Sequence, residues 1–186
     1  MIRAFIAIEI DSQAVKNISE RLAQLKPRLP DIRWIPPANF HLTLEFLGAV
    51  EETKIDPIYA ALERELHPFP RFTINAKGLG VFPDVKRPRI LWVGLEGKEL
   101  IALALRVETA LEPLGFAAEK REPKPHLTIG RWRHFDGSSR KLAAELENWK
   151  NHEFGASTVA EVVFFQSVLK PEGAVYHRLK AVVLGK

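Results

Sequence analysis

The chain of 186 residues contains no cysteine, which excludes disulfides, cysteine-based zinc sites and thiol nucleophiles. It also lacks any apolar run near the about 20 residues that a membrane-spanning helix needs. The apolar beginning is short and meets acidic residues at Glu9 and Asp11, so it is typical of a first strand and not of a signal peptide. We therefore expect a cytoplasmic protein that does not bind membranes.

Motifs for nucleotide cofactors and metals are absent as well. There is no P-loop, so ATP-dependent ligation is not expected. Gly78 and Gly80 resemble the start of a dinucleotide-binding fingerprint, but no third glycine follows, and a turn or bulge is the better interpretation. No histidines stand at His-x-His or His-x₃-His spacing. We expect no metal and no cofactor, with a histidine-rich metal site as the weaker alternative.

Basic residues are in slight excess, with a net charge of +4 and a sequence pI of about 9.4. Such a charge suits an anionic partner without proving one. Two groups of basic residues stand out in the sequence. One is Lys86, Arg87 and Arg89; the other is Lys120, Arg121, Lys124, Arg131 and Arg133. Basic side chains near histidines suggest a phosphate ligand.

Hydrophobic periodicity predicts strands that alternate irregularly with helices. Strands are expected at residues 3–10, 32–35, 40–47, 72–82, 90–95, 125–132, 157–169 and 175–184, with Gly48 ending the third. Helices are expected at residues 12–25, 51–66, 100–114 and 138–149. This order differs from the regular alternation of a doubly wound parallel sheet. It favours an α+β fold of two helix-plus-sheet halves within a single domain, residues 1–186.

One short phrase occurs in each half of the chain: His-Leu-Thr-Leu at residues 41–44 and His-Leu-Thr-Ile at residues 126–129. In a strand, residues i and i+2 point to the same face. Each copy would therefore present an imidazole and a hydroxyl side by side, with the aliphatic residues directed into a core. Two such strands facing one cleft would place a histidine on either side of a substrate, as acid–base chemistry at a phosphate requires.

Several segments, spread over nearly the whole chain, carry a resemblance to a known family. They are residues 3–8 (Arg-Ala-Phe-Ile-Ala-Ile), 39–48, 89–94 (Arg-Ile-Leu-Trp-Val-Gly), 125–131 and 165–173, followed by Tyr176. Together with the two His-x-Thr-x motifs, they resemble the 2H phosphoesterase superfamily. More narrowly, the chain is similar to RNA 2′,3′-cyclic phosphodiesterases, historically called 2′-5′ RNA ligases.

The resemblance implies a bilobal α+β fold with two pseudo-symmetric lobes of helices and antiparallel sheet around a central cleft. It also implies opening of a terminal 2′,3′-cyclic phosphate to a 2′-phosphate, without metal or cofactor. By the same resemblance, His41 is the proton donor and His126 the proton acceptor, while Thr43, Thr128 and Arg131 bind the phosphate. Arg131 is an odd number of residues after Thr128, however, so a regular strand would point it to the opposite face.

The expected partner is RNA with 2′,3′-cyclic phosphate ends, such as tRNA fragments or oligonucleotides, bound by a monomer. Two alternatives remain open at this point. One is 2′-5′ RNA ligation or cleavage of 2′-5′ linkages, and the other is a non-catalytic protein that binds RNA ends. Four aromatic residues are candidates for stacking on a base, and the sequence offers no choice among them: Trp34, Phe46, Trp132 and Phe165.

Overall fold

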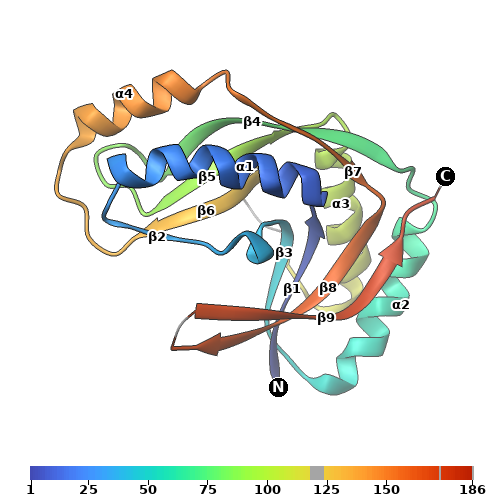
Figure 1. Ribbon diagram of the computed structural model, residues 1–186. Coiled ribbons are helices and arrows are strands. Elements are labelled where there is room, and N and C mark those ends of the chain that lie inside the picture. Colours follow the sequence, from blue (N-terminus) through green and yellow to red (C-terminus); the bar gives the residue numbers. More distant parts are fainter. Residues whose placement is uncertain (118–123, 172, 186) are drawn as a thin grey trace.

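The computed structural model describes residues 1–117, 124–171 and 173–185 (Figure 1). Its strands are β1 (Ile2–Glu9), β2 (Ile32–Trp34), β3 (His41–Val50), β4 (Phe72–Phe82), β5 (Ile90–Glu96), β6 (His126–Trp132), β7 (Glu153–Val159), β8 (Glu161–Lys170) and β9 (Gly173–Val183). The α-helices are α1 (Ser12–Leu25), α2 (Ile55–Leu66), α3 (Leu100–Leu111) and α4 (Ser139–Trp149). Short 3-10 turns lie at Lys26–Arg28, Pro37–Asn39, Glu52–Lys54 and Glu112–Leu114.

The strands form two antiparallel sheets, one in each lobe. The first sheet has the order β3-β1-β8-β9, and the second has the order β2-β6-β5-β4-β7. Helices α2 and α3 pack against each other, α2 also contacts β9, and α3 contacts β3. Helix α1 packs against β7, and α4 packs against β4 (Figure 1). The predicted α+β class with two similar sheet-and-helix halves is confirmed.

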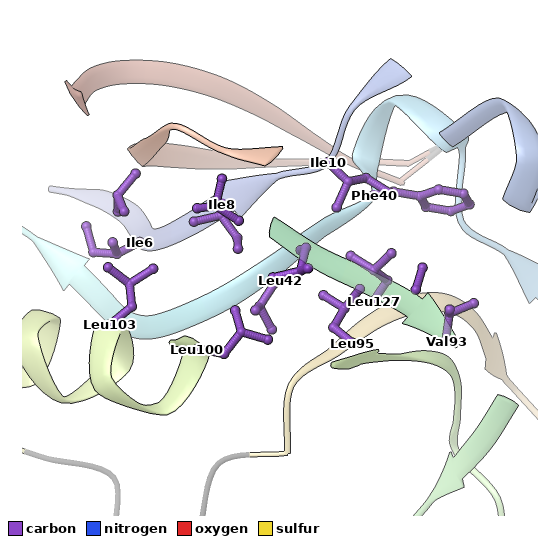
Figure 2. Packing of buried hydrophobic residues seen from close by; sticks show 14 of the residues in the cluster. Ile6, Ile8, Ile10, Phe40, Leu42, Val93, Leu95, Leu100, Leu103 and Leu127 are labelled. Carbon is purple, nitrogen blue, oxygen red and sulfur yellow. The ribbon is translucent and has the colours of Figure 1, made fainter. Parts of the chain in front are cut away.

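Apolar residues from both sheets share one buried cluster. Figure 2 shows part of it: Ile6, Ile8, Ile10, Phe40, Leu42, Val93, Leu95, Leu100, Leu103 and Leu127. Leu42 and Leu127 are the residues between histidine and threonine in the two motifs, and both are buried as the alternation predicts. Strands β3 and β6 also contact each other. Both motif strands thus rest on common packing, and a single domain over residues 1–186 stays a prediction.

Most strand ends differ from the prediction by one or two residues, and two differences are larger. Gly48 does not end β3: it lies within the strand with a left-handed φ of 68°, and the strand continues to Val50. The single strand expected at residues 157–169 is two strands, β7 and β8, which belong to different sheets. The chain crosses from the second sheet to the first at Ala160. Val159 and Ala160 before the junction and Val162 after it are apolar, and Glu161 is the only charged residue between them, so the pattern gives little sign of the crossing.

Within the described residues, no helix has both the length and the apolar character needed to cross a membrane.

Candidate active site

The two motif histidines occupy equivalent positions, because His41 begins β3 and His126 begins β6. Each Nδ1 atom forms a hydrogen bond with the carbonyl oxygen two residues earlier. The distances are 2.8 Å from His41 to Asn39 and 2.6 Å from His126 to Lys124. A carbonyl oxygen can only accept, so Nδ1 carries the hydrogen in both rings. The Nε2 atom of each imidazole is therefore the one left to take or give a proton.

Aromatic rings hold the first imidazole. The His41 ring lies with centroid distances of 4.9 Å to Phe5, 5.0 Å to Tyr176 and 6.3 Å to Phe165. These rings come from β1, β9 and β8, so all three other strands of the first sheet contribute. Tyr176 meets the imidazole at 89°, in an edge-on contact. Such packing limits the orientations that the catalytic candidate can adopt.

The second imidazole has an equivalent aromatic support. The His126 ring lies 5.0 Å from the ring of Phe82 and 6.3 Å from that of Trp92. Phe82 ends β4 and Trp92 lies in β5, which are the two strands next to β6 in the second sheet. Sequence reasoning gave no role to these residues or to Phe5 and Tyr176, because their partners are far apart in the chain.

Burial is the main influence on the protonation of both histidines. It lowers the pKa of His41 from 6.5 to about 4, against the opposing effect of the hydrogen bond with Asn39. The charges of Arg131 and His126 lower it further. For His126 the pKa is also lowered, first by burial and then by the Arg131 charge, while the bond with Lys124 opposes the shift. The Arg131 charge thus reaches both motif histidines, which come from different lobes.

A bulge explains how Arg131 reaches the site. The pairing of β5 with β6 matches Trp92 with Thr128 and Leu91 with Gly130, so Ile129 is an extra residue. An extra residue reverses the alternation of a strand. The residue three positions after Thr128 therefore returns to the face of His126 and Thr128. The expected conflict for Arg131 disappears, because the strand is not regular at this point.

The first lobe has the same irregularity. The pairing of β1 with β3 matches Ala7 with Thr43 and Ile6 with Glu45, so Leu44 is the extra residue. By the same reasoning, Phe46 lies on the face of His41 and Thr43. Its ring centroid is 6.2 Å from that of Phe5, which packs on His41. Phe46 is therefore the counterpart of Arg131 in the other lobe.

The four aromatic candidates differ in their accessibility. Phe165 is only 5% exposed and stacks on Phe5, so its ring is not accessible to a base. Phe46 is 69% exposed beside the site. Trp34 is half-buried, with the Lys26 ammonium 6.0 Å from its ring centroid. Trp132 lines a cavity together with Phe135. Phe46 and Trp132 are thus the better placed of the four to meet a base.

The two basic groups seen in the sequence meet around this cavity, which has a volume of about 590 Å³. Lys86, Arg87 and Arg89 come from one group and Arg131 and Arg133 from the other. Lys120 and Arg121 lie outside the described residues. Across the described part of the chain, no three His, Asp or Glu side chains are grouped so that they could hold a metal ion.

Comparison with known proteins assigns both halves of this chain to one family. A family model described as "LigT like Phosphoesterase" matches residues 8–92 and again residues 93–176. The RNA 2′,3′-cyclic phosphodiesterase of Methanocaldococcus jannaschii is 32% identical over 96% of this chain and 98% of its own length. That of Thermotoga maritima is 34% identical over 94% and 91%. The crystal structure of TT0787 from Thermus thermophilus superposes with a TM-score of 0.84 at 24% identity, covering 98% of both chains.

Proposed function

This chain belongs to the LigT-like phosphoesterase family, and from that premise we propose that it hydrolyses terminal 2′,3′-cyclic phosphates of RNA to 2′-phosphates. The observation that carries the proposal is the pair of equivalent imidazoles, each held through Nδ1 and each influenced by the charge of Arg131. The relatives from Methanocaldococcus jannaschii and Thermotoga maritima, both named RNA 2′,3′-cyclic phosphodiesterase, support the choice of substrate.

The proposed reaction uses the free Nε2 atom of each histidine. His126 accepts a proton from water, whose oxygen forms a bond with phosphorus. The bond from phosphorus to O3′ breaks, and His41 donates its proton to the departing O3′. One proton is taken and one is given, so proton exchange with solvent restores the starting state. The five-membered ring is strained, and the reaction therefore needs little beyond this pair and stabilisation of charge on the phosphate.

Three other side chains would provide that stabilisation. Thr43 and Thr128 lie on the same strand faces as the histidines, where their hydroxyls can donate to the non-bridging phosphate oxygens. Arg131 would oppose the charge that develops on these oxygens in the transition state. No step of the proposal passes through a metal ion or an organic cofactor.

The low pKa of His41 in the free protein fits a proton donor whose imidazole becomes protonated only when the substrate binds. A donor must be protonated, yet burial keeps this imidazole neutral at pH 7. A phosphodiester carries a negative charge, and an opposite charge within about 4–6 Å favours the imidazolium form. Substrate binding would therefore raise the pKa of His41 and prepare the donor only when the phosphate is present.

The direct test is to incubate a short RNA ending in a 2′,3′-cyclic phosphate with the protein in EDTA and identify the terminal product. We expect a 2′-phosphate. A 3′-phosphate would retain the histidine pair and reject O3′ as the leaving group. Reaction only after addition of a divalent ion would reject the metal-independent mechanism. No reaction under either condition would favour an RNA-end-binding protein, and an added RNA with a free 5′-hydroxyl would reveal 2′-5′ joining.

Variants assign the reaction to the two motifs. His41→Ala and His126→Ala should each abolish turnover while the circular dichroism spectrum stays that of the wild type. The exposed His177→Ala is the matched control, because His177 lies in β9 outside both motifs. Full activity in either motif variant would remove that histidine from the mechanism.

A further inference from the structure

A basic cavity of about 590 Å³ is lined by Arg131, the residue whose charge reaches both motif histidines. Its walls are residues 86–89 of the connection between β4 and β5, and residues 131–135 with Gly137 at the end of β6 and beyond it. The volume lies within the range of about 300–1,000 Å³ that is usual for ligand pockets. Its lining combines basic side chains with the aromatic rings of Trp132 and Phe135. The cavity can therefore hold a ligand of nucleotide size.

Hydrogen bonds fix the backbone that carries the basic side chains. The Arg89 N–H donates to the Phe82 carbonyl at 2.7 Å and closes the base of the connection. The Trp132 N–H donates to the Arg89 carbonyl at 3.1 Å and joins the two walls. The Asp84 carboxylate accepts the N–H groups of Lys86 and Arg87 at 2.8 and 3.1 Å. The position of this wall is thus set by the protein itself before any ligand binds.

The charge of the cavity is strongly one-sided. Five of its side chains are lysine or arginine: Lys86, Arg87, Arg89, Arg131 and Arg133. Among the residues that the structure describes, no carboxylate oxygen lies within 4.0 Å of the charged side-chain nitrogens of these five residues, whereas Arg28 and Arg106 have such partners elsewhere. Cations gathered at one surface repel one another and create a positive potential that attracts anions. A ligand with more than one negative charge is the natural occupant.

Arg131 is the residue that the cavity and the surroundings of the histidine pair have in common. It lines the cavity, and its charge lowers the pKa of both motif histidines. Phe82, whose ring packs on His126, is also the residue from which the basic connection begins. A strand whose terminal phosphate sits between the histidines would therefore meet the cavity next.

We propose that this cavity binds the RNA strand immediately 5′ of the cyclic phosphate. It would hold backbone phosphates at the cations and a base against Trp132 and Phe135, whose rings lie perpendicular at 6.2 Å. The proposal rests on the proposed function and adds to it: the preferred substrate is an RNA strand and not a cyclic mononucleotide. Recognition through phosphates would be largely independent of base sequence.

The test compares two substrates with one triple variant, Lys86→Ala with Arg87→Ala and Arg133→Ala. The substrates are an oligoribonucleotide with a 2′,3′-cyclic phosphate end and 2′,3′-cyclic AMP. The kcat/KM for the oligomer divided by that for 2′,3′-cyclic AMP should fall at least about tenfold in the variant at low salt. For the oligomer, the slope of log kcat/KM against log salt should be shallower by about 2 in the variant than in the wild type. The variant removes three cations, and each phosphate contact with a single strand contributes about 0.7 to the slope.

A matched control removes the same charge elsewhere. Lys16, Arg64 and Lys98 are exposed and do not line the cavity, so their combined replacement by alanine should leave the ratio unchanged. An equal fall of the kcat/KM ratio in both triple variants would mean that net charge alone causes the effect, and it would overturn the proposal. So would equal wild-type kcat/KM values for both substrates, although the proposed function would then survive.

Binding separates this proposal from the proposed function. Fluorescence anisotropy with the same labelled oligomer, in a His126→Ala background, measures affinity without turnover. The cavity variant should weaken binding at least about tenfold relative to the control variant. Unchanged binding would overturn the cavity assignment even if hydrolysis is observed. Weakened binding without any hydrolysis by the wild-type protein would retain the cavity and reject the proposed function.

Discussion

The buried imidazole of His41 should make the stability of the fold depend on pH. Its pKa is about 4 in the folded protein, against 6.5 for an unperturbed histidine. Each pKa unit is worth about 1.4 kcal/mol, so the difference corresponds to about 3 kcal/mol. The perturbation we choose is His41→Gln, which removes the titrating ring and keeps a polar side chain at the beginning of β3.

The direction follows from the numbers of protons bound. Between pH 4 and 6.5 the unfolded chain binds a proton at His41 that the folded protein does not bind. Acid therefore favours unfolding, and the contribution is complete above pH 6.5 and lost as the pH falls to about 4. Over this window, the free energy of unfolding of the wild type should fall relative to that of His41→Gln by up to about 3 kcal/mol.

Urea denaturation at a series of pH values measures this difference. Carboxylates also titrate near the lower end, so the quantity to follow is the wild-type value minus the variant value at each pH. The exposed His177→Gln provides the control, because it makes the same replacement outside both motifs. A difference that is constant with pH, or a nuclear magnetic resonance titration that places the His41 pKa at or above 6.5, would refute the reasoning.

Three further predictions concern activity and the surroundings of the histidines. The pH profile of kcat/KM should be bell-shaped with a maximum below pH 6.5, because both motif imidazoles have lowered pKa values, and a profile flat from about pH 5 to 9 would contradict paired acid–base catalysis. Arg131→Gln should raise the pKa of both imidazoles in a resonance titration, since its charge lowers them, whereas Arg133→Gln should not; unchanged values would separate this arginine from the site. Gly80→Ala would bring a Cβ within 2.0 Å of the Trp92 ring, so we expect the free energy of unfolding to fall by about 1–3 kcal/mol and kcat to fall as well. Adding Trp92→Phe should recover part of both losses. An unchanged free energy of unfolding for Gly80→Ala in urea denaturation would show that the Trp92 ring is not confined.

Sequence reasoning predicted the two strands that carry the candidate site, because their signal is local. In His41-Leu42-Thr43 the strand alternation alone places the imidazole and hydroxyl on one face and the leucine in the core, and Leu42 is indeed buried. The repetition of this pattern in the second half, together with the family resemblance, was sufficient to predict an α+β fold with two similar lobes.

Local periodicity does not predict the position of the Arg131 side chain. A period of two residues predicts the wrong face for it, because the extra residue Ile129 is a property of pairing between β5 and β6 and leaves no mark in the local pattern. The aromatic support of His41 is hidden for a similar reason. Phe5 and Tyr176 come together only because β1 and β9 belong to the same sheet, which local periodicity does not specify.

The two lobes share the motif, the hydrogen bond at Nδ1 and the bulge, and they differ in the side chain that each presents just after its bulge. The second lobe presents the cation of Arg131, and the first presents the exposed ring of Phe46. Because the histidines themselves are held alike, any difference between donor and acceptor roles must arise from such unequal surroundings. A charged group on one lobe and an apolar ring on the other suit a ligand that is itself unequal, with an anionic phosphate joined to an aromatic base.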